Sequence, residues 1–309
     1  MVSVSVRRAA GFQPYTAAYW DEQAHEWDQV IEIPTNPHQF YYFEADVLIA
    51  RTLKREMRVL ELGCGTGGST LVHAGEVSRL TSTDFSSEMV RLAAKKLRQM
   101  PHESSVDLSI CDACNLPFRD SSFDAIISRG VLLSYVVDPK AMLAESHRVL
   151  RPTGQIAMDA MNWIRGRART ISRGFQMTKD GPAYTEFFVS SGRQVKRIYN
   201  LKEDSPYTAL ASQYKSCAER PKDLRKYAVS TTKYEARLFT QQELKALAED
   251  TGFTDVRIAP LGQLTYALRS EDKTLKDFVV ANRHQLSRLM LLLGSHLRHG
   301  SALHLFIMA

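Results

Sequence analysis

The feature that most constrains the fold is a glycine-rich segment that directly follows a short apolar run. Residues 57–62 read Met-Arg-Val-Leu-Glu-Leu, and residues 63–68 read Gly-Cys-Gly-Thr-Gly-Gly. The apolar run predicts a buried strand, and the glycines permit a tight turn without side chains that would block a ligand. A helix is expected over 69–72, and its free N–H groups favour a polar or anionic ligand group.

The glycine spacing alone leaves the ligand open. Gly63, Gly65 and Gly68 satisfy the G-x-G-x-x-G dinucleotide pattern, and Asp84 lies near the position of a ribose-binding acid. Glu61 favours a different ligand, because a carboxylate beside the turn would repel a pyrophosphate but not a cationic or zwitterionic group. A glycine turn without any ligand is the remaining alternative.

Composition excludes several classes of protein. The chain has 309 residues, enough for one or two domains, and a net charge of +6, which permits a nucleic-acid partner without requiring one. Its four cysteines are too few for a disulfide scaffold and fit a reducing cytoplasm. We expect no secretory signal in the first ten residues and no membrane span, because no apolar run approaches roughly 20 residues.

Apolar runs and helical patterns alternate along much of the chain. Strands are expected at 57–62, 79–84, 106–111, 123–128, 155–159, 253–259 and 302–308, and helices at 86–100, 139–150 and 240–252. Pro152 and Gly154 are expected to form the turn into the fifth strand. This alternation predicts a parallel, doubly wound sheet, in which ligands bind at the carboxyl ends of the strands. Glu61, Asp84 and Asp112 would all lie at that edge.

The remaining segments do not show this alternation of strand and helix patterns. Residues 15–27 and 38–53 are helical and rich in aromatics, and 272–297 has an amphipathic helical pattern. Residues 162–237 look like an insertion whose arginine-rich part, 165–173, is expected to be a solvated surface loop, with RNA or an acidic substrate as the alternative.

Several motifs, taken together and in this order, resemble those of class I S-adenosylmethionine-dependent methyltransferases of the small-molecule, methyltransferase-11-like type. The segments are Glu61 to Gly67 with its glycines, Thr83-Asp84-Phe85-Ser86 with Met89, Cys111-Asp112-Ala113, Arg148 to Gly154, and Phe239-Thr240 through Gly252-Phe253. The segment 148–154 departs from the family in reading Pro-Thr-Gly where Pro-Gly-Gly is usual.

The resemblance implies an α/β fold with a Rossmann-like, seven-stranded, mostly parallel sheet flanked by helices and an inserted lid or substrate-binding region. The core is expected at 55–161, 238–260 and 300–309. Residues 1–54 would form N-terminal lid helices, 162–237 an insertion over the active site, and 261–299 a second helical insertion.

The resemblance also implies the cofactor S-adenosyl-L-methionine, with S-adenosyl-L-homocysteine as product. Glu61 would lie near the cofactor's ammonium group, Asp84 would bind the ribose hydroxyls, and Asp112 would bind the adenine amino group. The cofactor-binding residues expected in full are Glu61, Gly63, Cys64, Gly65, Asp84, Phe85, Met89, Asp112, Ala113, Ser128 and Arg129. Core packing is the alternative for Phe85 and Met89.

No residue is identified as catalytic, since methyl transfer from a sulfonium depends mainly on in-line positioning. His38, Tyr42 and Tyr135 are candidate bases, needed only for a hydroxyl or protonated amine acceptor. Cys111 and Cys114 form a C-x-x-C pair, but a zinc site would need a second pair, so no metal is expected.

The expected function is direct SN2 transfer of a methyl group to an O, N or C atom of a small or medium, partly apolar organic acceptor in the cytoplasm. The alternative is an RNA or protein methyltransferase, motivated by the basic charge. A non-enzymatic partner subunit and a nicotinamide oxidoreductase stay open as rivals. The apolar side of 272–297 would also suit a lid, a membrane surface or a second subunit in a homodimer.

Overall fold

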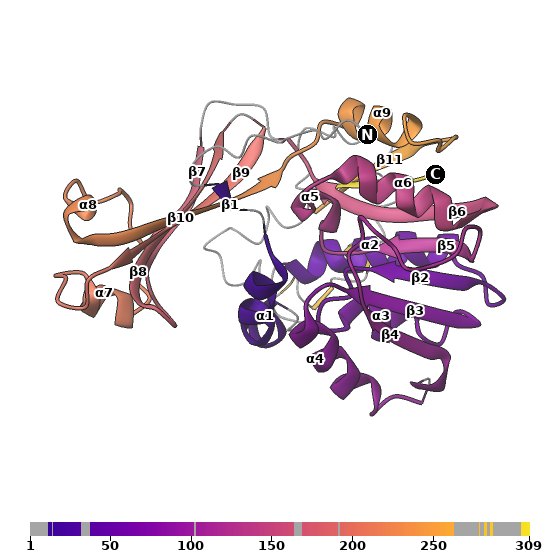
Figure 1. Ribbon diagram of the computed structural model, residues 1–309, viewed down its shortest axis with the longest axis horizontal. Helices are drawn as coiled ribbons and strands as arrows, with labels where there is room; N and C mark the ends of the chain where they lie inside the picture. Colours follow the sequence, from indigo (N-terminus) through magenta and orange to yellow (C-terminus); the bar gives the residue numbers. More distant parts are fainter. Residues whose placement is uncertain are drawn as a thin grey trace. The chain divides into compact units, whose positions relative to one another are not determined.

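The chain folds into two compact units, which are described separately (Figure 1). The computed structural model describes residues 12–13, 15–31, 38–101, 103–163, 169–190, 192–262, 278, 281–282, 285–286 and 304–309. One unit comprises the described parts of 16–164 and 239–309, and the other those of 1–15 and 165–238.

The first unit is built on a seven-stranded sheet. Its strands are β2 (Arg58–Leu62), β3 (Arg79–Asp84), β4 (Val106–Ile110), β5 (Phe123–Ser128), β6 (Leu150–Met161), β11 (Arg257–Leu261) and β12 (His304–Met308). Their spatial order is β11-β12-β6-β5-β2-β3-β4, and β12 runs antiparallel to both neighbours while the other pairs are parallel. The predicted Rossmann-like, mostly parallel sheet is confirmed.

Helices cover both faces of this sheet (Figure 1). They are α1 (Ala17–Glu26), α2 (His38–Thr52), α3 (Gly68–His73), α4 (Ser87–Leu97), α5 (Leu132–Tyr135), α6 (Pro139–Val149) and α9 (Gln241–Glu249), with a π-helical turn at Trp27–Ile31 and a 3₁₀ turn at Glu103–Ser105. Ser86 and Asp138 cap α4 and α6, and Thr240 with Glu243 forms the expected capping box of α9.

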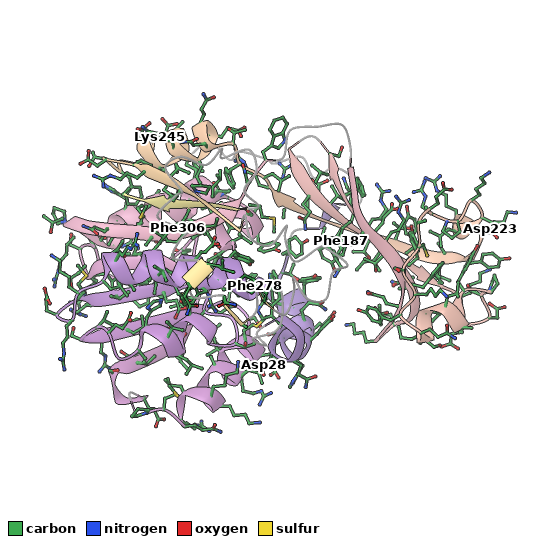
Figure 2. The ribbon with its side chains drawn as sticks, turned by 180° about the vertical axis from the view of Figure 1, so that it is seen from behind. Asp28, Phe187, Asp223, Lys245, Phe278 and Phe306 are labelled. Carbon is green, nitrogen blue, oxygen red and sulfur yellow. The ribbon has the colours of Figure 1, made fainter. Side chains whose placement is uncertain are left out.

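Alternate residues of the central strands supply two separate cores. On β5, Ile126 packs in a core with residues of α6 and α9, whereas Ala125 and Ile127 pack in the other core with residues of α2. Phe306 of β12, fully buried and labelled among the strands in Figure 2, belongs to the α2 side. Burial on both faces explains why these strands are almost continuously apolar.

Two strand boundaries differ from the prediction. The strand β6 begins at Leu150, so Pro152 and Gly154 lie inside it and do not form the turn; the pairing with β5 shifts register there instead. The strand β11 begins at Arg257 rather than at Phe253, because Asp255 has a φ of 54°, which interrupts the extended backbone.

The second unit is a five-stranded sheet with the order β1-β10-β9-β8-β7. Its strands are β1 (Phe12–Gln13), β7 (Arg169–Thr178), β8 (Gly181–Ser190), β9 (Arg193–Leu201) and β10 (Ala228–Arg237), joined by the short helices α7 (Thr208–Ser212) and α8 (Leu224–Tyr227). The expected surface loop at 165–173 is wrong from Arg169 onward, since that part belongs to β7; alternation in β7 places Phe175 in the core with Tyr184.

The predicted helix 272–297 lies largely outside the described residues. Within the described ranges, no helix combines the length and apolarity needed to cross a bilayer. That 1–54, 162–237 and 261–299 form lids stays a prediction.

Candidate functional site

Polar groups lie at or near the carboxyl ends of five neighbouring strands, along one edge of the large sheet. Across the order β6-β5-β2-β3-β4, these groups are Asp159, Ser128, Glu61, Asp84 and Asp112. The register fixes their alignment, because Glu61 pairs with Ile127 on one side and with Ser82 on the other. The carboxyl ends of parallel strands are the usual ligand-binding edge of such a sheet.

The glycine turn adopts the backbone conformation that its residues predict. Gly63, Gly65 and Gly67 have φ values of 69°, 54° and 91°, which side chains disfavour. The Cys64 N–H donates to the Thr83 carbonyl at 2.9 Å, which ties the turn to β3. The Cys64 thiol is buried, and its burial raises its pKa well above the ordinary value, so it stays protonated.

Asp84 joins the glycine turn to the start of α4. Its Oδ2 accepts from the Gly65 N–H at 3.0 Å, and its Oδ1 accepts from the Ser86 N–H at 2.9 Å. Burial raises its pKa to about 6, although these backbone donors oppose the rise. A Cβ placed on Gly65 would meet no atom within 4 Å, so open space lies directly beside the carboxylate.

The buried Glu61 side chain accepts hydrogen bonds from the described residues through one carboxylate oxygen only. Its Oε2 accepts from the hydroxyls of Thr70 and Ser82, both at 2.6 Å, and its side chain is buried. Within the described part of the chain, nothing donates to Oε1. The hydroxyls orient the carboxylate and leave an oxygen for a cationic group.

Asp112 is exposed at the end of β4. Its Oδ1 accepts from the Cys114 N–H at 2.8 Å, and the Cys111 N–H before it donates to the Asp84 carbonyl at 3.1 Å. Ala113 is half-buried. Burial raises the pKa of both thiols, and no metal-binding group of three His, Cys, Asp or Glu side chains occurs in the described ranges.

The two residues expected to hold adenine differ in their surroundings. Phe85 is half-buried beside Asp84. Met89 is 3% exposed and packs with Ala24, Leu92 and the tryptophans of the first helical segment, Trp20 and Trp27. Met89 therefore belongs to a packed apolar cluster, and the adenine-binding role of Met89 and Phe85 stays a prediction.

A turn at the end of β5 lies against the glycine turn. A Cβ on Gly63 would approach the Leu132 side chain to 3.0 Å. The Ser128 hydroxyl is buried and has no hydrogen-bond partner in the described residues. Arg129 forms an ion pair with Asp46 at 2.8 Å and lies 4.4 Å from the centroid of the Tyr42 ring.

Aromatic side chains of the N-terminal helices meet this turn. Tyr41 and Tyr42 of α2 are buried, with ring centroids 4.3 Å apart. Trp20 of α1 packs edge-on against Tyr135, with ring centroids 5.2 Å apart. Burial, together with the nearby Asp159, raises the pKa of Tyr135, so this phenol donates hydrogen bonds at neutral pH and is a poor base. His38 begins α2, but its side chain lies outside the described residues.

Residues 60–158 match the family model described as a methyltransferase domain. This segment of the chain is a class I S-adenosylmethionine-dependent methyltransferase domain. Its curated relatives include a demethylmenaquinone methyltransferase of Symbiobacterium thermophilum, 26% identical over 66% of this chain and 82% of the relative. A phosphatidylethanolamine N-methyltransferase of Cereibacter sphaeroides is 37% identical over 33% of this chain and 49% of the relative. A demethylmenaquinone methyltransferase of Lactobacillus johnsonii is 37% identical, but this chain spans only 41% of it.

Solved structures support the fold of the methyltransferase. The CcbJ methyltransferase of Streptomyces caelestis superposes with a TM-score of 0.59 at 14% identity, covering 94% of this chain and 96% of that one. An S-adenosylmethionine-dependent methyltransferase of Clostridium acetobutylicum gives a TM-score of 0.51 at 14% identity, over 94% and 97% of the two chains.

The site of the methyltransferase suits a nucleoside with a cationic tail. Open space at Gly65 borders a carboxylate that can accept from two ribose hydroxyls, and Glu61 presents an uncommitted oxygen. The unpartnered hydroxyl of Ser128 adds a buried polar group at the same edge. A row of carboxylates would repel a pyrophosphate, which favours such a nucleoside over a dinucleotide at this site.

Sequence reasoning missed two features of the site. Asp159 is a fully buried acid at the end of the fifth strand, the same signal that identified Asp84 and Asp112. The second feature is a network in which Asp46 binds both Arg129 and His73. His73 is 27 positions and Arg129 is 83 positions from Asp46 along the chain, and no local sequence pattern predicts contacts over such separations.

Proposed function

We propose that this methyltransferase moves the methyl group of S-adenosyl-L-methionine to an O, N or C atom of a small or medium, partly apolar organic acceptor. The row of carboxylates at the strand ends carries the cofactor half of the proposal. The aromatic cluster of Trp20, Tyr41, Tyr42 and Tyr135 supports the acceptor half, because it gathers apolar ring surface beside the end of β5.

The residues of this chain contribute to the reaction by binding the cofactor and by orienting the acceptor. Asp84 would bind the ribose, Asp112 and Phe85 would bind the adenine, and Glu61 with the turn after β5 would bind the methionine part. Bound S-adenosylmethionine supplies a methyl group already activated by a positively charged sulfur. The aromatic residues would orient the acceptor atom in line with the methyl group, at the roughly 3–3.5 Å from which such reactions gain most of their rate. The acceptor's electron pair would form the new bond to carbon, the pair of the broken carbon–sulfur bond would stay on sulfur, and the proton of an O–H, N–H or C–H acceptor would pass to a base or to water.

The relatives favour a small acceptor over RNA or protein. They are named for demethylmenaquinone and phosphatidylethanolamine, which are small organic molecules with apolar tails. The arginines of 165–173 motivated the RNA alternative, yet Arg169 and Arg173 belong to a regular strand that pairs with β8.

Methyl transfer from labelled S-adenosylmethionine tests the proposal directly. The full chain is incubated with a quinol carrying an apolar tail, with phosphatidylethanolamine, with total RNA and with a protein extract. The proposal expects label in an organic-extractable small molecule. Label in RNA, with transfer falling steeply as salt rises, would replace this acceptor class with nucleic acid.

We also propose a cellular compartment and an oligomeric state for this chain. All four cysteines are free thiols, which supports a reducing compartment such as the cytoplasm. A homodimer is a further expectation, which sedimentation equilibrium of the full chain would test.

A further inference from the structure

Val131 holds a backbone conformation that its side chain disfavours. It has a φ of 61° and a ψ of 32°, the left-handed region, and it follows Gly130, whose φ is 99°. Among the described residues, the other non-glycine residues with positive φ are Ser121, Tyr214 and Asp255, none of which is β-branched. Such strain in a β-branched residue persists only where the surroundings enforce it, and it clusters at functional sites.

Asp159 enforces this conformation from the neighbouring strand. Its Oδ1 accepts from the Val131 N–H at 2.7 Å, and its Oδ2 accepts from the Gly130 N–H at 3.3 Å. The carboxylate is fully buried, so water does not compete for either bond. One side chain therefore fixes two consecutive peptide groups.

The direction of these N–H groups sets the direction of two carbonyls. The described peptide bonds are all trans, so the C=O of each peptide points opposite to its N–H. The carbonyls of Arg129 and Gly130 therefore point away from Asp159 together. A Cβ on Gly63 would approach the side chain of the adjoining residue Leu132 to 3.0 Å, so the turn that carries these carbonyls lies next to the glycine turn.

We propose that Asp159 is a positioning residue, which locks the turn of residues 129–131 so that its paired carbonyl oxygens face the cationic methionine part of the cofactor. It does not touch the cofactor itself. Two aligned carbonyl dipoles attract a cation, and their orientation is fixed before the ligand arrives, so binding does not have to order them. The proposal rests on the cofactor assignment and adds a residue to it.

Asp159→Asn provides the decisive variant. An asparagine has nearly the same shape, but only one of its two side-chain atoms can accept a hydrogen bond, so one of the two N–H groups loses its partner. We expect affinity for S-adenosylhomocysteine, measured by calorimetry well below the unfolding temperature and above pH 7, where the Asp159 carboxyl is ionised, to fall about tenfold, as for one misdirected charge-assisted hydrogen bond.

Glu44→Gln is the matched control. Glu44 is also a buried carboxylate that accepts a backbone glycine N–H, from Gly262 at 2.8 Å, but it does not bond to the turn. Only Asp159→Asn is expected to weaken binding, and the unfolding temperature of both variants is measured alongside to separate a loss of stability from a loss of affinity. Equal affinities for the ligand in both variants would reduce Asp159 to a structural role and overturn the proposal.

A measurement on the unaltered protein covers the case in which Asp159→Asn does not fold. Hydrogen bonds to a carboxylate move amide proton resonances downfield, so the Gly130 and Val131 amides should show this signature. Addition of S-adenosylhomocysteine should shift the carbonyl carbons of Arg129 and Gly130. Unshifted carbonyls in a protein that binds the ligand overturn the proposal, whereas no binding by the unaltered protein overturns the cofactor assignment instead.

Discussion

At the scale of single residues, two glycines of the same turn, Gly65 and Gly67, are needed for different reasons. Both have positive φ, so any side chain strains the backbone at either position. A Cβ on Gly67 would lie 3.1 Å from the Ala93 Cβ and 3.2 Å from its Cα, whereas a Cβ on Gly65 would enter open space. Gly67 thus permits helix packing, and Gly65 leaves room for a ligand beside Asp84.

Alanine at each position should separate these roles. Gly65→Ala is expected to cost about 1–2 kcal/mol of stability from backbone strain and to weaken S-adenosylhomocysteine binding by about tenfold or more. Gly67→Ala should cost more, roughly 2–4 kcal/mol, because contact with the Ala93 backbone adds to the strain. Urea unfolding and calorimetric titration of both variants provide the test, and a larger stability loss in Gly65→Ala would contradict the assignment.

At the scale of elements, a buried ionic network ties α2 and α3 to the end of β5. His73 on α3 is fully buried and lies 2.7 Å from Glu76 through Nδ1 and 3.3 Å from Asp46 through Nε2. Asp46 on α2 in turn binds Arg129. Burial lowers the pKa of His73, but its two carboxylate partners outweigh burial and raise it to about 9, so the ring is charged at neutral pH.

His73→Ala should therefore be strongly destabilising, by about 3 kcal/mol, since it removes one partner of a buried pair. His25→Ala is the control, because His25 pairs with Glu88 at 3.0 Å while remaining 62% exposed. Its removal should change stability by less than about 1 kcal/mol. The two variants are compared by urea unfolding at pH 7, and similar losses in both would show that the network does not hold these elements together.

Local chemistry made much of the element order predictable. Thr240 with Glu243 marked the start of α9, and the apolar run before Gly63 marked β2. The start of β6 was missed because Pro152 usually ends a strand, and only the observed register shift against β5 shows how the strand continues through it. Contacts such as Asp46 with Arg129 join residues whose proximity is decided by packing of the whole sheet, so their spacing in sequence carried no signal.

At the scale of the whole molecule, the buried carboxylates make stability depend on pH. Burial raises the pKa of Asp84 from 3.8 to about 6, of Glu44 from 4.5 to about 7, and of Asp159 from 3.8 to about 7. The folded protein therefore holds these protons to a higher pH than the unfolded chain does. The stabilising contribution is complete below about pH 4 and is lost as pH rises toward 7.

The free energy of unfolding should therefore fall between about pH 4.5 and 7, by on the order of 1 kcal/mol or more for each carboxylate. The fall should continue from about pH 6.5 to 9 as His73 loses its proton. Glu44→Gln should flatten the lower part of this curve, because the glutamine does not titrate. Urea unfolding across this range checks the sign, and a stability that rises steadily from pH 5 to 9 would contradict it.

The central claim concerns the whole edge of the sheet, where neighbouring strand ends together bind one sulfonium nucleoside. Calorimetric titration of S-adenosylmethionine into the unaltered chain, Asp84→Ala and Asp107→Asn tests it most directly. Asp107 lies on the neighbouring strand, but its exposed carboxylate pairs with Arg79 away from the glycine turn. We expect Asp107→Asn to bind like the unaltered chain and Asp84→Ala to lose about a hundredfold in affinity, as for two charge-assisted hydrogen bonds. Equal affinity in all three proteins would contradict it.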